Sequence, residues 1–453
     1  MPRIPLVSGL EGSEKLPRTR RALQNCFKNA KGRIIAFPGI TQLATTSKVA
    51  RGSFEWNGSL YMVVSQSLIK ITDATTGAFS TIGTIAGSQP IETDVGFNDA
   101  VIVVKGGAIY TLDKTDTLAT ISGNANFVAC VDVTHIDGRF VYIPESGDPA
   151  FFSDVGAAGT VQAASFFDAE ELPDKNNGCF NFSNTLFITG TDSMELFRNT
   201  GASPVPFARI RGSRISNGYI GGLLEHDDTF LFLGRKKDQD FGIFAISQGK
   251  AVKISNAAIE LILSTYTQSE LAEAISGRIN WRGDDIATFT LRRDSFGFFG
   301  GNWFKLDTLL SGVSRPWAGG YITQFGGKYY TAYDDKIGVI ADVNTDYGER
   351  ITRIIDFVFE QEDGATFTVQ SIELGLSQGF NAALGSVALL LSRDNVLYGP
   401  ELFRNVGLIG EYAAKLLYAP AGGLGSYDGF LGVRFYTTED IFFSVDFISV
   451  KIA

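Results

Sequence analysis

Apolar, strand-length segments separated by short polar turns recur along most of the chain. Seven copies of this hairpin pattern are present, reading FEWNGSLYMVV (54–64), DVGFNDAVIVV (94–104), VTHIDGRFVYI (133–143), CFNFSNTLFIT (179–189), LLEHDDTFLFL (223–233), INWRGDDIATF (279–289) and YITQFGGKYYTAY (321–333). Their turns begin at Asn57, Asn98, Asp137, Ser183, Asp227, Gly283 and Gly326, so successive copies lie 41, 39, 46, 44, 56 and 43 residues apart. A repeat of about forty residues is typical of β-propeller blades. We therefore predict an all-β chain with a propeller of six or seven blades over residues 51–345, and the count favours seven.

The turn residues support this interpretation. Asn-Gly, Asp-Gly and Gly-Gly pairs favour tight hairpins because their residues tolerate positive φ angles at low cost. The alternative, a series of unrelated hairpins in a sandwich, predicts no constant spacing.

The pattern changes after about Tyr347. Five segments alternate apolar and polar residues without the forty-residue step, at 353–361, 366–377, 386–393, 430–438 and 442–452. Such alternation predicts an antiparallel β-sandwich over residues 346–453, which has room for an additional strand from the N-terminal segment.

One helical insertion interrupts the repeats at residues 255–276. Ile259, Ile262, Leu263 and Tyr266 recur at helical spacing and form one apolar face. Thr267 and Glu270 have the spacing of a capping box, which predicts the start of a second helix. The insertion is expected to brace the propeller rim, and a contact with a partner is the alternative.

Residues 1–50 form a basic segment on an acidic chain. Residues 1–51 contain ten Lys and Arg against Glu11 and Glu14, whereas the whole chain has a net charge of −10. We interpret the segment as an arm that docks on a partner, with a solvated tail as the alternative. Its expected contact residues are Arg18, Arg20, Arg21, Phe37, Pro38 and Gly39.

Cysteine content and hydropathy place the chain among reduced, globular proteins. Cys26, Cys130 and Cys179 are widely spaced and form no CxxC pair, so buried thiols are expected rather than a disulfide framework. No apolar run reaches the length of a membrane span, and the first residues lack a secretory apolar region. Synthesis in a cytoplasm is therefore expected.

The residues that most often carry chemistry are sparse. The two histidines, His135 and His226, lie far apart beside predicted turns, which disfavours a zinc site or a catalytic triad. Paired carboxylates occur at Asp227-Asp228, Asp284-Asp285, Asp334-Asp335 and Glu170-Glu171. Propeller glycosidases use two carboxylates, but the first two pairs coincide with hairpin turns, where Asp is favoured for backbone reasons.

Short motifs add no site. Arg282-Gly283-Asp284 and Asn57-Gly58-Ser59 resemble an adhesion tripeptide and a glycosylation sequon, yet both coincide with repeat turns. A phosphate-binding loop is followed by a helix, whereas no helix is expected after the glycine-rich AGGLGSYDG (421–429). No catalytic residue, metal ligand or cofactor is predicted.

Several segments resemble the packaged-DNA stabilisation proteins of short-tailed phages, which are also described as tail hubs or nozzles. The matching stretches are IIAFPGIT (34–41), VARGSFEWNGSLYMVV (49–64), SNTLFITGTDSMELFRNTGA (183–202) and SNAAIELILSTYTQSELAEA (255–274). They follow the family's order through the propeller region, whereas residues 346–453 resemble the family only in strand content.

The resemblance implies a non-enzymatic virion protein, assembled in the host cytoplasm into a phage tail. It implies a homo-hexameric ring below the portal and its adaptor, which continues the DNA channel, retains the packaged genome and carries a needle or plug and the tailspikes or fibres. DNA is expected to pass through the lumen without sequence-specific binding, because an acidic wall repels phosphates.

Two other classes of function remain open. A propeller lectin or glycosidase acting on cell-surface polysaccharide would need inward-facing carboxylates with Trp, and the chain has Trp56, Trp281, Trp303 and Trp317. A soluble propeller scaffold for cellular partners is the third class, and ring formation or virion binding would distinguish a hub from it.

Overall fold

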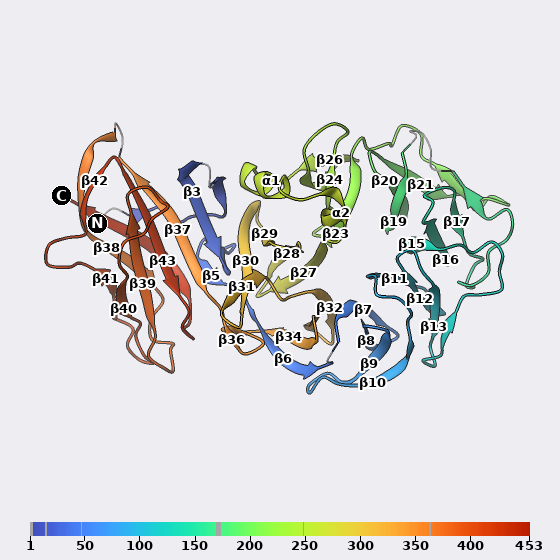
Figure 1. The fold of residues 1–453 in the computed structure, drawn as a ribbon, viewed down its shortest axis with the longest axis horizontal. Helices are drawn as coiled ribbons and strands as arrows, with labels where there is room; N and C mark the ends of the chain where they lie inside the picture. The colour runs from blue at the N-terminus through green and yellow to red at the C-terminus, as the bar shows by residue number, and fades with distance from the viewer. Residues whose placement is uncertain (1–2, 14–15, 47, 169–173, 248, 362–363) are drawn as a thin grey trace.

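The chain folds into a ring of β-blades joined to a β-sandwich (Figure 1). The computed structural model describes residues 3–13, 16–46, 48–168, 174–247, 249–361 and 364–453, without the side chains of residues 13–20. Nearly all of its regular structure is strand, and the two helices in these residues are short. The predicted all-β fold is confirmed.

Six blades are built from four consecutive antiparallel strands each. The strands of the first three are β7 (Ala50–Trp56), β8 (Ser59–Val64), β9 (Ser67–Asp73), β10 (Ala78–Thr84), β11 (Ile91–Val95), β12 (Asp99–Val104), β13 (Ile109–Asp113), β14 (Leu118–Thr120), β15 (Cys130–Ile136), β16 (Arg139–Pro144), β17 (Ala150–Phe152) and β18 (Phe166–Phe167). Those of the next three are β19 (Asn176–Phe182), β20 (Thr185–Gly190), β21 (Met194–Asn199), β22 (Phe207–Arg209), β23 (Gly218–His226), β24 (Thr229–Arg235), β25 (Gly242–Ser247), β26 (Lys250–Lys253), β27 (Ile275–Trp281), β28 (Asp284–Thr290), β29 (Ser295–Phe299) and β30 (Asn302–Leu310).

A seventh, composite blade closes the ring. It contains β32 (Tyr321–Phe325), β33 (Lys328–Tyr333), β34 (Lys336–Ala341) and, from the N-terminal segment, β6 (Gly39–Thr45). β6 pairs antiparallel with β34, with Gly39 opposite Ala341 and Thr45 opposite Lys336. The short strands β35 (Thr345–Asp346) and β36 (Glu349–Arg350) continue this sheet beyond β6. The hydroxyl groups of Ser53 and Thr323, 2.7 Å apart, join the first blade to the seventh.

The predicted hairpins are all present as the first two strands of the seven blades. Asn57 and Gly58 both have positive φ angles, of 48° and 67°, as a tight hairpin requires. The second turn spans the three residues between Val95 and Asp99, and the sixth has positive φ from Arg282, one residue before the predicted Gly283.

Most of the second strands bury residues on both faces, since each blade packs between two others. In β12, Val101, Ile102 and Val103 are all fully buried. This explains why the repeats read as continuous apolar runs rather than as alternation.

The helical insertion lies between the fifth and sixth blades. Helices α1 (Ala257–Leu263) and α2 (Gln268–Ala272) begin at N-caps Asn256 and Thr267, and Thr267 with Glu270 forms the predicted capping box. Ile259 and Leu263 of α1 are fully buried. Asn256 also donates a hydrogen bond of 2.7 Å to the carbonyl of Leu10, so the insertion braces the N-terminal segment as well as the rim.

The sandwich consists of two sheets that share one core. One contains β1 (Arg3–Ile4), β4 (Cys26–Lys28), β5 (Ile34–Ala36), β38 (Thr366–Leu376), β41 (Leu416–Tyr418), β42 (Gly425–Asp428) and β44 (Ser444–Ile452). The other contains β2 (Glu11–Ser13), β3 (Leu16–Gln24), β37 (Arg353–Glu360), β39 (Ser386–Ser392), β40 (Leu402–Asn405) and β43 (Phe430–Thr437). Strand β31 (Val313–Pro316) extends the sixth blade from β30.

The N-terminal segment holds the two parts together. β3 pairs in parallel with β30 of the sixth blade and antiparallel with β37 of the sandwich, which makes one 11-stranded sheet of blade and sandwich strands. β1 and β5 pair with β44, and β6 belongs to the seventh blade. Residues 1–50 were predicted as an arm that could add one strand to the sandwich; their described strands join the sheets of both parts, and their apolar residues enter the shared core.

Candidate functional site

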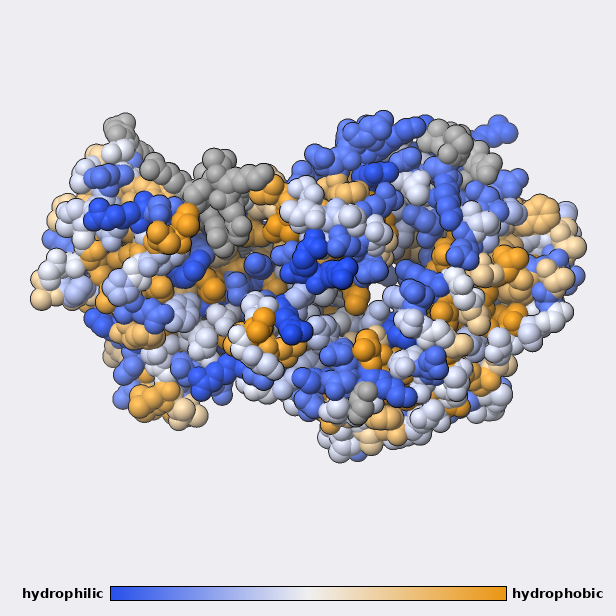
Figure 2. Space-filling view, in the orientation of Figure 1, coloured by the Kyte–Doolittle hydropathy of each residue, from blue (hydrophilic) through white to orange (hydrophobic). Residues whose placement is uncertain are grey.

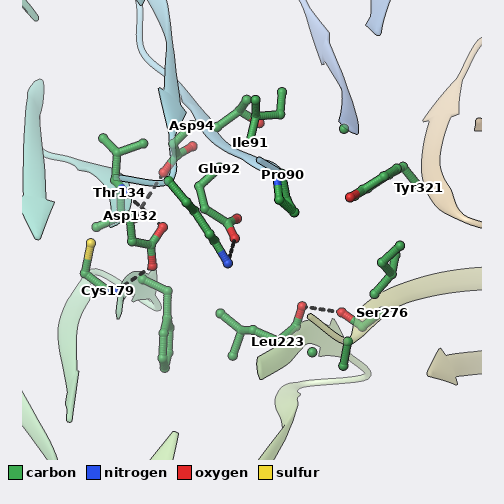
Figure 3. A pocket seen from close by; sticks show the side chains of 18 of the residues that line it. Pro90, Ile91, Glu92, Asp94, Asp132, Thr134, Cys179, Leu223, Ser276 and Tyr321 are labelled. Carbon is green, nitrogen blue, oxygen red and sulfur yellow. Dashed lines mark hydrogen bonds and ion pairs between the residues drawn. The ribbon is translucent and has the colours of Figure 1, made fainter. Parts of the chain in front are cut away.

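The axis of the propeller encloses a polar cavity (Figure 3). It has a volume of about 440 Å³ and is lined by the first strands of the blades and by residues 272–274 at the end of α2. The space-filling view shows a small opening near the centre of the ring (Figure 2). Because each blade turns its first strand toward the axis, polar residues of these strands meet here.

An ion pair projects into this cavity from the second blade. Lys105 Nζ lies 2.8 Å from Glu92 Oε1. The negative charge of Glu92 is the main reason why the pKa of Lys105 rises above its ordinary value, against the opposing effect of burial. Lys105 therefore stays charged.

Asp132 of the third blade lies close to this pair. Its carboxylate accepts a hydrogen bond of 2.8 Å from the backbone N–H of Cys179. Burial, followed by the negative charge of Glu92, raises the pKa of Asp132 well above its ordinary range, although the Cys179 N–H and Lys105 oppose the shift. Across the cavity, burial raises the pKa of Tyr321 to about 12.

The carboxylates of the axis bind the backbone of neighbouring blades. Asp94 of the second blade accepts bonds of 3.0 Å from the Thr134 hydroxyl and 2.6 Å from the His135 N–H of the third. Asp132 makes the equivalent bond from the third blade to the fourth. Burial also raises the pKa of Asp94. The first function that this geometry supports is fastening blade to blade.

Other polar side chains continue this pattern around the axis. Asn177 donates 2.7 Å to the Tyr219 carbonyl, which joins the fourth blade to the fifth. Ser276 donates 2.7 Å to the Leu223 carbonyl, which joins the sixth blade to the fifth. The axial residues thus stabilise the closed ring.

Sequence reasoning missed this axial cluster. Its signal was present as carboxylates within otherwise apolar first strands, at Glu92, Asp94 and Asp132. These carboxylates are not adjacent in the sequence, because the cluster is assembled from different blades.

The adjacent carboxylate pairs lie elsewhere. His226, Asp227 and Asp285 place possible ligand atoms within 4.8 Å of one another beside two hairpin turns. Asp285 is already engaged, since its two oxygens lie 2.9 and 3.0 Å from Arg278 Nε. His226 is buried, with Nε2 at 3.1 Å from the carbonyl oxygen of Asp285.

The remaining pairs have structural positions. Asp284 is buried and accepts a bond of 3.3 Å from the Ala30 N–H. Asp334 has a positive φ of 50° in the turn before β34. Glu170 and Glu171 lie outside the described residues.

Three of the six expected contact residues are buried, and the other three lie on one strand. Phe37, Pro38 and Gly39 are buried inside this chain, and the Phe37 ring packs at 5.2 Å from Trp317 and 5.8 Å from Phe304. They therefore hold the joint between the two parts and offer almost no surface to a partner. This corrects the expectation that Phe37, Pro38 and Gly39 contact a partner.

The three arginines all belong to β3. Arg21 is exposed, and its Nη1 lies 3.7 Å from Glu11 Oε2. The side chains of Arg18 and Arg20 lie outside the described residues. A contact between these arginines and a partner stays a prediction.

The other residues singled out by the sequence lie in the core. Cys26, Cys130 and Cys179 are buried free thiols, as expected. Trp56, Trp303 and Trp317 are buried and Trp281 is half-buried. None of these four indole rings lines the axial cavity as a carbohydrate platform would.

Across the described ranges, no helix combines the length and the apolar character that crossing a membrane requires.

Comparison with known proteins gives relatives in sequence and in structure. The family described as "Bacteriophage P22 Gp10, beta-propeller" matches residues 2–345. The tail hub protein gp10 of Salmonella phage P22 is 22% identical over 462 residues, which cover 94% of this chain and 95% of that protein.

Solved structures give weaker likenesses. The extracellular domain of a putative hybrid two-component system from B. thetaiotaomicron matches with a TM-score of 0.46 and 9% identity, covering 77% of this chain and 45% of that chain. Virginiamycin B lyase from Staphylococcus aureus matches with a TM-score of 0.43 and 9% identity, covering 67% and 98%. Neither likeness carries an argument about function. The family match spans well over half of the sequence, and the chain therefore belongs to the bacteriophage P22 Gp10 β-propeller family.

Proposed function

We propose that this protein is a structural hub of a phage tail. The observation that carries the proposal is the end-to-end match to the tail hub protein of phage P22, which includes the sandwich as well as the propeller. On this proposal six copies form a ring below the portal adaptor. The ring continues the DNA channel, retains the packaged genome and anchors a needle and the spikes or fibres.

The charge of the chain supports a conduit. Each copy has a net charge of −10, and we propose that a ring of these acidic copies presents an acidic wall to the lumen. Such a wall repels the phosphate backbone, whereas a basic wall would bind DNA nonspecifically and hinder its passage.

The axial cavity supports a role without catalysis. Asp94 and Asp132 use their carboxylates to bind the backbone of adjacent blades. Buried carboxylates whose hydrogen bonds are satisfied in this way make the assembly of blades more rigid. We propose that the protein is not an enzyme and that its axial polar residues serve ring stability.

The experiment is a phage that lacks this protein, complemented by the full chain from a plasmid. Without the protein we expect heads that package DNA, lack completed tails and lose their genomes; complementation restores tails that bind an antibody against this chain. Normal tails and retained genomes without the protein would refute the proposal.

The arginines of β3 are proposed to dock on an acidic adaptor. Arg can bind carboxylates through two parallel hydrogen bonds, which sets register as well as affinity. Arg18→Ser, Arg20→Ser and Arg21→Ser together should reduce hub incorporation into tails, while Lys48→Ser serves as a matched basic control. Normal incorporation with leaking genomes would instead indicate contact with DNA.

A further inference from the structure

The sandwich carries an exposed apolar patch at one end. Its five side chains are Phe380, Leu384, Ile409, Tyr412 and Phe442, exposed by 57%, 71%, 69%, 68% and 39%. The Phe380 ring lies 6.1 Å from the Tyr412 ring and 5.0 Å from the Phe442 ring, so the three aromatic side chains form one cluster. We call these five residues the aromatic patch.

Buried hydrogen bonds hold the loops of the aromatic patch in place. Asn381, only 3% exposed, donates 3.1 Å to the Gly407 carbonyl and accepts 2.7 Å from the Phe442 N–H. The Gly407 N–H in turn donates 2.6 Å to the side-chain oxygen of Gln378. The patch is therefore ordered before it meets a partner, which reduces the entropy cost of binding.

The hairpin of β39 and β40 carries a recess at the end opposite the aromatic patch. β39 and β40 pair with Ser386 opposite Asn405 and Leu389 opposite Leu402, so residues 393–401 join them at the end far from the aromatic patch. Here a recess of about 620 Å³ has apolar and aromatic lining residues, among them Leu391, Leu402, Leu424 and Tyr427, beside the charged Arg393 and Asp394. We call it the hairpin recess.

We propose that the aromatic patch of one copy docks in the hairpin recess of the next copy around the ring. The inference rests on the proposed function, since a hub ring requires contacts between copies. An exposed apolar surface and a recess at opposite ends of one sandwich can form a head-to-tail contact, and head-to-tail contacts generate a ring when the rotation from copy to copy closes. Patch-to-patch contact would give only pairs.

The size of the patch fits this occupant. From the exposed fractions and typical side-chain areas, the five residues present roughly 500–600 Å² of mostly apolar surface. A stable interface buries about 800 Å² per partner, with its apolar residues at the centre. The patch therefore supplies the core of a contact between two copies.

Cross-linking in assembled tails tests the docking. The chain with Tyr412→Cys and Leu397→Cys places one thiol on the patch and one on the rim of the recess, both in exposed positions. The natural cysteines are buried and do not compete. Mild oxidation should give a ladder of multimers on a non-reducing gel. The control chain, Phe97→Cys with Leu397→Cys, moves the first thiol to an exposed propeller turn and should give no ladder.

The outcomes separate this inference from the proposed function. Tails that contain the cysteine variant but yield only monomers, or a cross-link to a different tail protein, overturn the docking and leave the hub role standing. Absence of the wild-type protein from tails overturns both. Phe380→Ser with Tyr412→Ser should also lower incorporation at least tenfold, because central aromatic residues dominate interface affinity. Phe97→Ser should leave incorporation unchanged.

Discussion

Arg51 shows how a single buried charge organises the link between two blades. It is 3% exposed, and its guanidinium donates hydrogen bonds to the carbonyls of Ser65, Ile85, Ala86 and Gln89, at 2.7, 3.1, 3.3 and 2.6 Å. Burial lowers the pKa of Arg51, yet a guanidinium keeps its charge in proteins. One side chain thus fixes the path from the first blade to the second.

Arg51→Lys is expected to destabilise the fold although it keeps the charge. An ammonium group cannot reach the same four carbonyls, and buried acceptors left without donors cost about 1–3 kcal/mol. Urea denaturation should show this loss in the free energy of unfolding. Arg33→Lys, on an exposed ion pair with Asp446, should change it by less than about 1 kcal/mol. Equal effects of the two substitutions would contradict the role of Arg51.

Asp346 gives the fold a dependence on pH. Its carboxyl is 2% exposed; one oxygen accepts 2.8 Å from the Thr308 hydroxyl, and the other accepts no hydrogen bond from the part of the chain that the structure describes. Burial raises the pKa of Asp346 to about 7, against about 3.9 in an unfolded chain. Between these two values the folded state holds a proton that the unfolded state has released, so stability falls as the pH rises from about 4 to about 7.

Asp346→Asn should remove this contribution to the pH dependence of stability. The variant is expected to lose less stability than the wild type between pH 4 and pH 8, measured as the denaturation midpoint at each pH. Asp342→Asn changes an exposed carboxylate and serves as the control. An unchanged pH slope in Asp346→Asn would show that folding does not raise the pKa of this carboxyl.

These buried charges mark the limit of prediction from sequence. The turn residues were predictable because Asn57 and Gly58 act through their own backbone preferences. The burial of Asp346 and Asp132 was not, because it depends on segments that are distant in the chain. Asp346 is enclosed by β6 and by Thr308, and Asp132 binds Cys179 in the next blade.

The composite blade depends on the close approach of β6 to β34. A Cβ atom at Gly338 would lie 2.5 Å from the Ile40 methyl and 2.8 Å from the Tyr347 ring. A side chain at position 338 would therefore push β6 away from β34, and glycine lets the two strands pack closely here.

Gly338→Val should loosen β6 while the six consecutive blades stay folded. We expect faster amide hydrogen exchange across residues 39–45 and earlier proteolysis in this segment. Gly422→Val is the matched control, because no atom lies within 4 Å of a Cβ at that position. Unchanged exchange in β6 would mean that the strands tolerate the added side chain.

The same elements explain which parts of the fold were predicted. The hairpins, the helical insertion and the sandwich strands follow from local periodicity, and all are present. The role of residues 3–45 does not follow from local periodicity, because β3 and β6 pair with strands roughly 300 residues away in the sequence. A cluster of Arg residues dominated the sequence of this segment, while the apolar residues that enter the core were distributed between its turns.

The propeller and the sandwich behave as one body on this structure. A single hydrophobic core contains Ile279 and Phe304 of the sixth blade together with Ile355 and Phe435 of the sandwich. The 11-stranded sheet continues through both parts. A shared core and a shared sheet couple the stability of the two parts.

Ile355→Ala should therefore destabilise both parts together. Ile355 is fully buried in β37, and truncation of such a residue costs about 2–5 kcal/mol. Hydrogen exchange should accelerate in β29 and β30 as well as in β43. Val396→Ala, at an exposed loop position, should accelerate neither. Acceleration limited to the sandwich strands would show that the two parts unfold independently.

The pairing of β6 with β34 also sets an order of events during synthesis. A ribosome that adds about 5–20 residues per second needs roughly 15–60 s to make the residues between these strands. For that time β6 must remain without its partner, and its apolar residues are exposed to the cell. A chain whose translation stops before β34 cannot complete the ring, so only fully translated copies can present a closed propeller for assembly.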